Sequence, residues 1–295
     1  MDQDLYFDFY GVTTRLRCAP SDVPEALFNF AGQQIDPVPA AEVQVKVVLT
    51  CPEWPERGFF TSLLRKDGLR KRIEVERRTE DGWLREADHT FTDWSELSSP
   101  LPPFRYSQLW QRLAVAPGTC LWLPGDHGVL LSGDNYVGKT SAALALCARG
   151  ARLVSDSLAV LDLQSGLFRR HDSPLGFRRG SRRYHLERIV SGDYRETVSP
   201  DTGLVLLARA EEFLGRPNLE QVRVTRLIHL VRAEQAGPGP AVVPTDVSAW
   251  FSGADRQDIS RHLPEHTEVL AFSPDASPDE VADLIEARVS GAPAC

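Results

Sequence analysis

The residues most able to do chemistry in this 295-residue chain lie in the stretch LSGDNYVGKT, at positions 131–140. Gly133 is followed, after four residues, by Gly138, Lys139 and Thr140, which is the spacing of a phosphate-binding loop. In such a loop, backbone N–H groups surround phosphate oxygens, the lysine reaches the β- and γ-phosphates, and the hydroxyl binds Mg²⁺. The stretch therefore predicts a site for ATP and Mg²⁺, formed by Gly133, Asp134, Asn135, Tyr136, Val137, Gly138, Lys139, Thr140 and Ser141.

A phosphate-binding loop also needs a carboxylate at the end of a neighbouring strand to hold the metal. The stretch LVSDS, at 153–157, supplies Asp156. Asp162 is a second candidate, further along what we expect to be the same strand. We predict that Thr140 and Asp156 bind the metal, and the alternative is that Asp156 only closes a turn or caps a helix.

The elements that must position these residues alternate between strand and helix, which predicts an α/β domain over 106–295. An apolar strand enters the loop, and an alanine-rich helix leaves it and ends before Gly150, a residue that suits a helix C-terminus. Ser277 and Glu280 form a capping box that opens a last helix. The expected elements are a hairpin of 119–123 with 128–132, a helix over 139–149, strands over 152–163 and 222–231, and a helix from 277 to about 289.

The first 105 residues predict a smaller β-rich domain. Its clearest signal is a hairpin that turns at 80–82, between two runs of alternating residues. SSPLPPF, at 98–104, breaks regular structure, and we place the domain boundary there. We see no catalytic group of residues in this part and expect that it holds a substrate.

The amino-acid composition limits the kinds of binding partner that we expect. The formal net charge is −8 and the pI about 5.4, so the whole chain offers no electrostatic attraction to nucleic acid or an anionic membrane. The chain lacks a signal-peptide pattern at its start and any apolar run near the roughly 20 residues of a membrane span. The five cysteines include no CxxC pair. We therefore expect a cytoplasmic protein without a zinc site or disulfide framework; an oligomer is possible, but no pattern supports one.

GVLLSGDNYVGKTSAALALCARGARLVSDSLAVLD, at 128–162, resembles the HPr kinase/phosphorylase family. Its relatives include kinases of free serine and kinases of ribosomal peptide precursors. The marks of the resemblance are the hairpin before the loop, the GD that opens it and the ARGARLVSD after it. The resemblance implies a P-loop fold in a compact form that transfers the γ-phosphoryl group of ATP to a hydroxyl.

The chain departs from the family at two positions that matter for proton transfer. The family has two adjacent aspartates, where this chain has Asp156 and Ser157. The family also has a histidine just before the first hairpin strand, where this chain has Pro117. If Leu123 pairs with Gly128, counting back sets Thr119 opposite Ser132 and brings Pro117 level with the mouth of the loop. His127 is then at the far end of its strand, roughly 16 Å away.

The segment 171–188 carries five arginines in an acidic chain, and its glycines predict a flexible loop. PLGFR, at 174–178, resembles a Pro-x-x-x-Arg segment of the family, which implies that Arg178 binds phosphate oxygens and takes part in catalysis with Lys139 and Asp156. The alternative is a solvated basic turn. His171 or His185 could replace the missing base.

Three functions remain open from the sequence. The first is an ATP-dependent kinase whose acceptor is a serine or threonine of a peptide or protein, or a small hydroxylated metabolite. The second is a nucleotide-binding regulator or inactive pseudokinase, which Pro117 and Ser157 favour. The third is a phosphorylase or phosphohydrolase at the same site.

Overall fold

The structure is a computed structural model that describes residues 1–50, 71–91, 109, 112–199, 203–233, 247–252 and 255–291. The backbone divides into two compact units, Met1–Trp110 and Gln111–Cys295. The segment 98–104, where we expected the boundary, lies outside the described residues. Among the helices of the described ranges, none is both long and apolar enough to cross a membrane.

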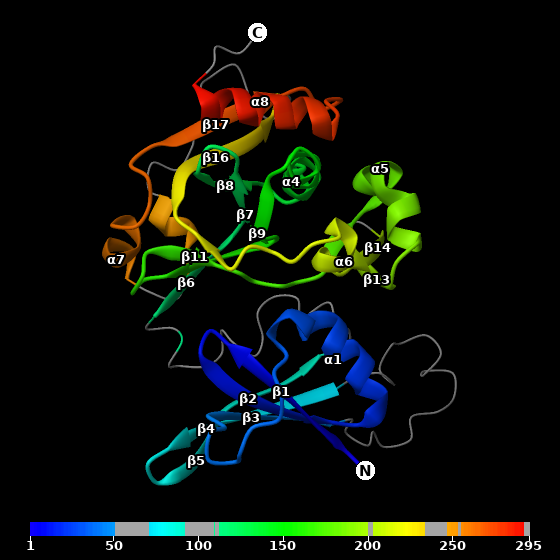
Figure 1. Cartoon of the computed structure of the whole chain (residues 1–295), viewed down its shortest axis with the longest axis vertical. Helices are drawn as coiled ribbons and strands as arrows, with labels where there is room; N and C mark the ends of the chain where they lie inside the picture. The colour runs from blue at the N-terminus through cyan, green and yellow to red at the C-terminus, as the bar shows by residue number, and fades with distance from the viewer. Residues whose placement is uncertain are drawn as a thin grey trace. The chain divides into compact units, whose positions relative to one another are not determined.

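In the residues that the structure describes, the first unit is a five-stranded sheet with one α-helix (Figure 1). Three phenylalanines join them: the ring centroids of Phe7 and Phe9 in the first strand lie 5.9 and 5.6 Å from that of Phe30 in the helix. The predicted hairpin is present, with strands that end and begin at Thr79 and Gly82. The elements, in sheet order, are β1 (Gln3–Phe9), β2 (Val12–Cys18), β3 (Val45–Thr50), β4 (Lys71–Thr79) and β5 (Gly82–Phe91), with α1 (Val23–Phe30).

The second unit is built on a five-stranded sheet whose middle strand, β8, enters the predicted phosphate-binding loop. It pairs antiparallel with β7 and parallel with β16. In order, the strands are β17 (Thr267–Phe272), β16 (Val224–Arg232), β8 (His127–Gly133), β7 (Thr119–Leu123) and β9 (Arg152–Ser155). Helices α4 (Lys139–Ala148) and α8 (Pro278–Ser290) pack together beside this sheet (Figure 1).

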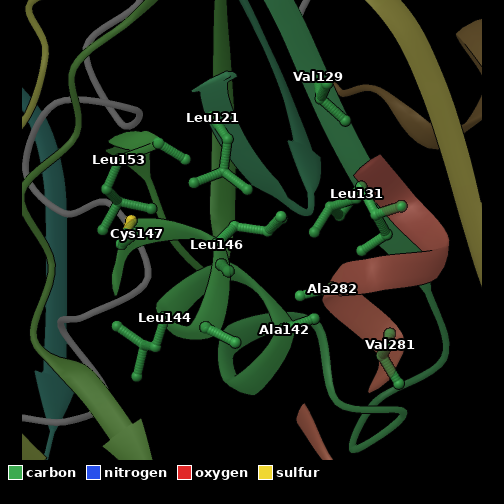
Figure 2. Close-up of a cluster of buried hydrophobic side chains, with 14 of the residues drawn as sticks. Leu121, Val129, Leu131, Ala142, Leu144, Leu146, Cys147, Leu153, Val281 and Ala282 are labelled. Atoms are coloured by element: carbon green, nitrogen blue, oxygen red, sulfur yellow. The ribbon is translucent and has the colours of Figure 1, made fainter. Parts of the chain in front are cut away.

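Apolar burial fixes α4 against the sheet. Leu146 is fully buried, and Figure 2 shows it among Leu121 of β7 and Leu153 of β9, with Ala282 of α8 on the other side of the helix. Truncating a fully buried leucine typically costs about 2–5 kcal/mol of stability. Helix α4 is therefore packed against neighbouring elements along most of its length. The capping box of α8 is present as predicted: the backbone N–H of Ser277 donates to Glu280, and that of Glu280 to Ser277.

Two smaller sheets complete the second unit. One contains, in order, β15 (Gln221–Val222), β11 (Leu167–Arg169), β10 (Leu158–Asp162) and β6 (Leu113–Pro117). The other contains β12 (Leu175–Phe177), β14 (Gly203–Ala208) and β13 (Tyr194–Ser199). The remaining helices are α5 (Arg179–Val190), α6 (Ala210–Leu214) and α7 (Arg256–Ser260).

Three local predictions were wrong. The segment 152–163 is two strands in two different sheets, because the chain turns at Asp156 and at Ser157, whose φ is 65°. The hairpin register differs by one residue: Leu123 pairs with His127, and Thr119 with Leu131. Most of the basic segment 171–188 is a strand and a helix, β12 and α5, rather than a flexible loop.

Candidate functional site

The loop between β8 and α4, which we predict to bind phosphate, makes a tight turn. Gly133 and Gly138 have φ values of 134° and 114°, in a region that favours glycine. A Cβ at Gly133 would lie 2.6 Å from the carbonyl oxygen of Leu230 on β16. Tyr136 also has a positive φ of 69°. These conformations turn the chain sharply enough for α4 to begin at Lys139, with its free N–H groups at the loop.

The side chain of Lys139, at the start of α4, folds back across the loop that precedes it. Its Nζ donates to the carbonyl oxygens of Gly133 and Asp134, at 2.8 and 2.9 Å. Burial lowers the pKa of Lys139, while the nearby Asp156 and Asp134 raise it. An anionic ligand would favour the charged form further. The ammonium is therefore positioned beside the predicted phosphate position without a carboxylate in direct contact.

The remaining loop residues divide into exposed and buried ones. Asp134, Asn135 and Tyr136 are exposed, whereas Val137 is buried in the core below the loop. The side chain of Val137 anchors the loop, so only its backbone is available to a ligand. Ser141, in the first turn of α4, is half-buried.

Asp156 is the buried centre of a cluster of hydroxyl groups. It is 2% exposed and directly follows β9. Its carboxylate accepts hydrogen bonds from the hydroxyls of Thr119 (2.6 Å), Thr140 (2.9 Å) and Ser157 (3.2 Å). The hydroxyl of Ser173 donates to its backbone oxygen at 3.1 Å. The two residues predicted to bind the metal, Thr140 and Asp156, are therefore in contact.

Asp162 lies elsewhere. It ends β10, in a different sheet, and its carboxylate is 3.3 Å from Arg112 and 3.7 Å from Arg169. Both partners are arginines, so Asp162 closes an ion-pair cluster. It is not part of the loop site.

The donor set fits Mg²⁺. This ion prefers oxygen ligands, keeps several waters, and is held by one or two protein oxygens together with substrate phosphates. The Thr140 hydroxyl and an Asp156 oxygen offer such a pair at the N-terminus of α4. No cluster of three or more His, Cys, Asp or Glu side chains suited to a metal occurs in the described ranges, so a bound ion would need phosphate or water for its other ligands.

Arg178 reaches the loop from the start of α5. Its guanidinium carbon lies 4.7 Å from the ring centroid of Tyr136, and its charge acts on Lys139. Arg232 donates to the backbone oxygen of Tyr136 at 3.1 Å. The neighbouring Arg179 is exposed on α5. Two arginines from separate elements, Arg178 and Arg232, thus contact the same loop residue.

His229 is a site residue that the sequence reasoning missed. It pairs with Ser132 across the parallel strands β16 and β8, one residue before the loop begins. Its Nδ1 is 3.0 Å from the Ser132 hydroxyl, and its ring lies 5.4 Å from that of Trp250. Burial lowers the pKa of His229, Asp134 raises it, and Lys139 lowers it. A histidine within the apolar run LIHLV was the available signal, but only the strand pairing shows that it lies beside the loop.

The two histidines considered as replacement bases differ in position. His171 is buried and bridges to Ser155, the residue before Asp156. His185 is on α5, with its ring 5.5 and 5.7 Å from those of Phe177 and Phe213. Burial lowers the pKa of His185. His171 is therefore near Asp156, whereas His185 packs on aromatic rings.

Pro117 and Ser157, the two residues that depart from the family pattern, lie next to each other. Pro117 pairs with Leu158, and the N–H of Gly118 donates to the backbone oxygen of Ser157. Ser157 is exposed beside Asp156. Proline and serine therefore stand together at the positions where the resemblance implies a histidine and a second aspartate.

No protein-family model matches the chain, and no curated protein sequence matches it either. Among solved structures, the chain is similar to the HPr(Ser) kinase/phosphatase from Coxiella burnetii. The match covers 60% of this chain and 94% of that one, at 17% identity and a TM-score of 0.33. A likeness this distant carries no residue roles, so the roles below rest on the site itself.

Proposed function

We propose that this chain is an ATP-dependent kinase that transfers the γ-phosphoryl group to a hydroxyl. The observation that carries the proposal is the meeting of three groups at one point. Lys139 and Thr140 begin α4, and the carboxylate of Asp156 contacts the Thr140 hydroxyl from the end of β9. A cation, a metal-binding hydroxyl and a metal-binding carboxylate at one helix N-terminus are the parts that phosphoryl transfer requires.

The residues would act mainly by position and charge. The transition state of phosphoryl transfer is loose, with charge spread over the γ-phosphoryl oxygens. Lys139 would exchange its two carbonyl contacts for β- and γ-phosphate oxygens. Arg178 would leave the Tyr136 ring to form a forked contact with the same phosphates. Mg²⁺, held by Thr140 and Asp156, would supply neutralising charge between the phosphates.

The proton of the acceptor hydroxyl needs a destination. Asp156 already accepts three hydroxyl hydrogen bonds, which favours a metal-holding role over that of a base. His171 and His185 were the candidates from sequence, and His185 packs on aromatic rings. His229 is a better placed candidate, since it is half-buried beside the loop and burial lowers its pKa, which favours the neutral imidazole that a base requires. Direct transfer of the proton to phosphate late in the reaction is the remaining route.

A second function competes with this one. Pro117 and Ser157 stand together where a base and a second acid are expected, which supports a nucleotide-binding regulator without transfer activity. Phosphoryl transfer tolerates the loss of one base better than most reactions, because electrostatic stabilisation dominates its rate. We therefore prefer the kinase.

Mass spectrometry can decide between the two functions. The protein would be incubated with ATP, Mg²⁺ and candidate hydroxyl acceptors, including serine- and threonine-containing peptides and the products of neighbouring genes. A kinase adds one phosphate to an acceptor, and Lys139→Ala abolishes the addition. ATP binding without transfer to any acceptor, together with transfer gained in Pro117→His with Ser157→Asp, would establish the inactive regulator instead.

A further inference from the structure

Helix α5 carries positive charge that its surroundings do not neutralise. Five arginines stand at its start or along it, namely Arg178, Arg179, Arg182, Arg183 and Arg188. Within the described part of the chain, none of them has an ion-pair partner. Several other exposed arginines of the unit do form ion pairs. Examples are Arg149 with Asp283, Arg226 with Glu268 and Arg261 with Asp258.

Three of these arginines lie on aromatic rings instead. Arg178 contacts Tyr136, Arg183 contacts the neighbouring Tyr184, and Arg188 lies 4.7 Å from the centroid of Phe213. Stacking on a ring leaves the edge of a guanidinium, where its N–H donors are, free to meet an anion. The side chains are thus held in place while much of their hydrogen-bonding capacity is unused.

A groove runs along this helix. It has a volume of about 840 Å³ and lies between α5, the end of α4, α6 and the start of α8. Arg183, Arg188 and Arg216 line it, together with Glu187 and Asp279. Arg149 binds Asp279 at 3.2 Å but also binds Asp283 and Glu286, so both carboxylates of the groove count against its three arginines. The groove is therefore net positive, in a chain whose net charge is −8.

Exposed apolar side chains lie beside the arginines of α5. Tyr184 and Leu186 line the groove and are 43% and 49% exposed, and Val190 at the end of α5 is 50% exposed. The Nε2 atom of His185, which also lines the groove, is buried without a hydrogen-bond partner. Such a mixture suits a chain that offers both carboxylates and apolar side chains, rather than a free inorganic anion.

The position of α5 connects this surface to the candidate active site. Its first arginine, Arg178, contacts Tyr136 of the phosphate-binding loop, and the helix leads away from there. Arg179 and Arg188 are about 14 Å apart along the helix at 1.5 Å per residue. An extended peptide of about four residues spans that length.

We propose that α5 and its groove bind an acidic peptide segment of the protein substrate and so bring its hydroxyl to the loop. This proposal rests on the proposed kinase function, because the docked peptide is taken to belong to the protein that is phosphorylated. Peptide binding itself can be measured without phosphoryl transfer. Nucleic acid and anionic membranes are disfavoured as occupants, since both extend far beyond one helix and would meet the acidic remainder of the chain.

Fluorescence anisotropy of the full chain without ATP tests the surface directly. The probe is a labelled peptide of about ten residues, rich in glutamate, with one phenylalanine and one serine. We expect binding that weakens as salt rises, and at least about tenfold weaker binding to Arg183→Glu with Arg188→Glu. A peptide with lysine in place of glutamate should not bind.

Matched controls separate the surface from general charge and from stability. Arg223→Glu with Arg261→Glu makes the same change in net charge on exposed residues outside α5, and it should retain binding. Because Arg188 also stacks on Phe213, the pair Arg179→Glu with Arg183→Glu provides a second test that leaves this contact intact. Equal binding of the glutamate and lysine peptides, or no loss in either α5 variant, would overturn the proposal.

Two further results bear on the occupant and on the function. Tighter binding of duplex DNA or phosphatidylserine vesicles than of the peptide, lost in the same α5 variants, would refute a peptide as the occupant. If the peptide binds at α5 but neither it nor any other tested acceptor receives phosphate from ATP, the docking surface stands and the kinase function fails. If phosphate is transferred from ATP to another hydroxyl acceptor and acidic peptides do not bind, the kinase function stands and the docking surface fails.

Discussion

Replacing Asp156 by asparagine removes one negative charge from the centre of the hydroxyl cluster while preserving the shape of the side chain. The carboxylate accepts from three hydroxyls, at 2.6, 2.9 and 3.2 Å. Hydroxyls can rotate to suit the new amide, and the desolvation cost of a buried charge disappears. We therefore expect the melting temperature to change by only a few degrees.

Catalysis should suffer far more than stability. The variant loses an anionic metal ligand, and an interaction of this kind is worth several kcal/mol in the transition state. A loss of about 3 kcal/mol corresponds to a fall in kcat/KM on the order of 10²-fold. The assay is steady-state transfer from ATP at varied Mg²⁺, which should show a weaker dependence on the metal. With EDTA present, the affinity for ATP should match that of the wild type.

Asp162→Asn is the matched control. Asp162 is similarly buried but pairs with Arg112 and Arg169 in another sheet. Because Arg112 is 34% exposed, solvent screens the pair, and we expect a stability loss of about 1 kcal/mol with kcat/KM unchanged. Equal losses of activity in the two variants, or a larger loss at Asp162, would refute the placement of the metal at Asp156.

Three other perturbations have separate readouts. Arg178→Ala should lower kcat/KM for ATP by tenfold or more, since a charged donor to phosphate contributes about 1.5–3 kcal/mol. At saturating acceptor, Arg179→Ala should leave kcat/KM for ATP unchanged, and equal values in both variants would remove Arg178 from the site. If His229 is the base, burial lowers its pKa, so activity should be lost as pH falls through a value below 6.5. That limb of the pH–rate profile should vanish in His229→Ala and persist in His171→Ala, and the reverse pattern would assign the base to His171. Burial raises the pKa of Cys147 to about 11, so iodoacetamide should modify it about a hundredfold more slowly than an exposed cysteine; rapid labelling in the native state would contradict the packing of α4.

Local patterns in the sequence predicted the elements that carry their own signals. The glycines and the lysine of the loop, the alanine-rich helix that follows, and the Ser277–Glu280 capping box depend on neighbours within a few residues. The structure has the helix at Lys139–Ala148 and the capping box at its predicted residues. Asp156 also follows its strand directly, as expected.

Longer-range features could not be read in the same way. The run 152–163 has apolar residues on both sides of the polar stretch 155–157. The positive φ at Ser157 has no sequence signature of its own, so the pattern does not distinguish one long strand from two. Helix α5 is mostly polar and charged, and Ile189 is its buried residue. Its sequence therefore shows no helical period of apolar residues. The approach of His229 to Ser132 depends on parallel pairing between strands almost a hundred residues apart.

Calorimetric titration of ATP with Mg²⁺ into the wild type and Lys139→Ala tests the central claim most directly. Lys139 contacts the loop carbonyls at 2.8 and 2.9 Å and packs against no carboxylate, so its loss should leave the circular dichroism spectrum unchanged. Lys46→Ala, in the first unit, provides a lysine control. The loop assignment predicts saturable binding to the wild type and to Lys46→Ala, and binding at least about tenfold weaker to Lys139→Ala. No binding to the wild type, or equal affinities in all three proteins, would contradict it.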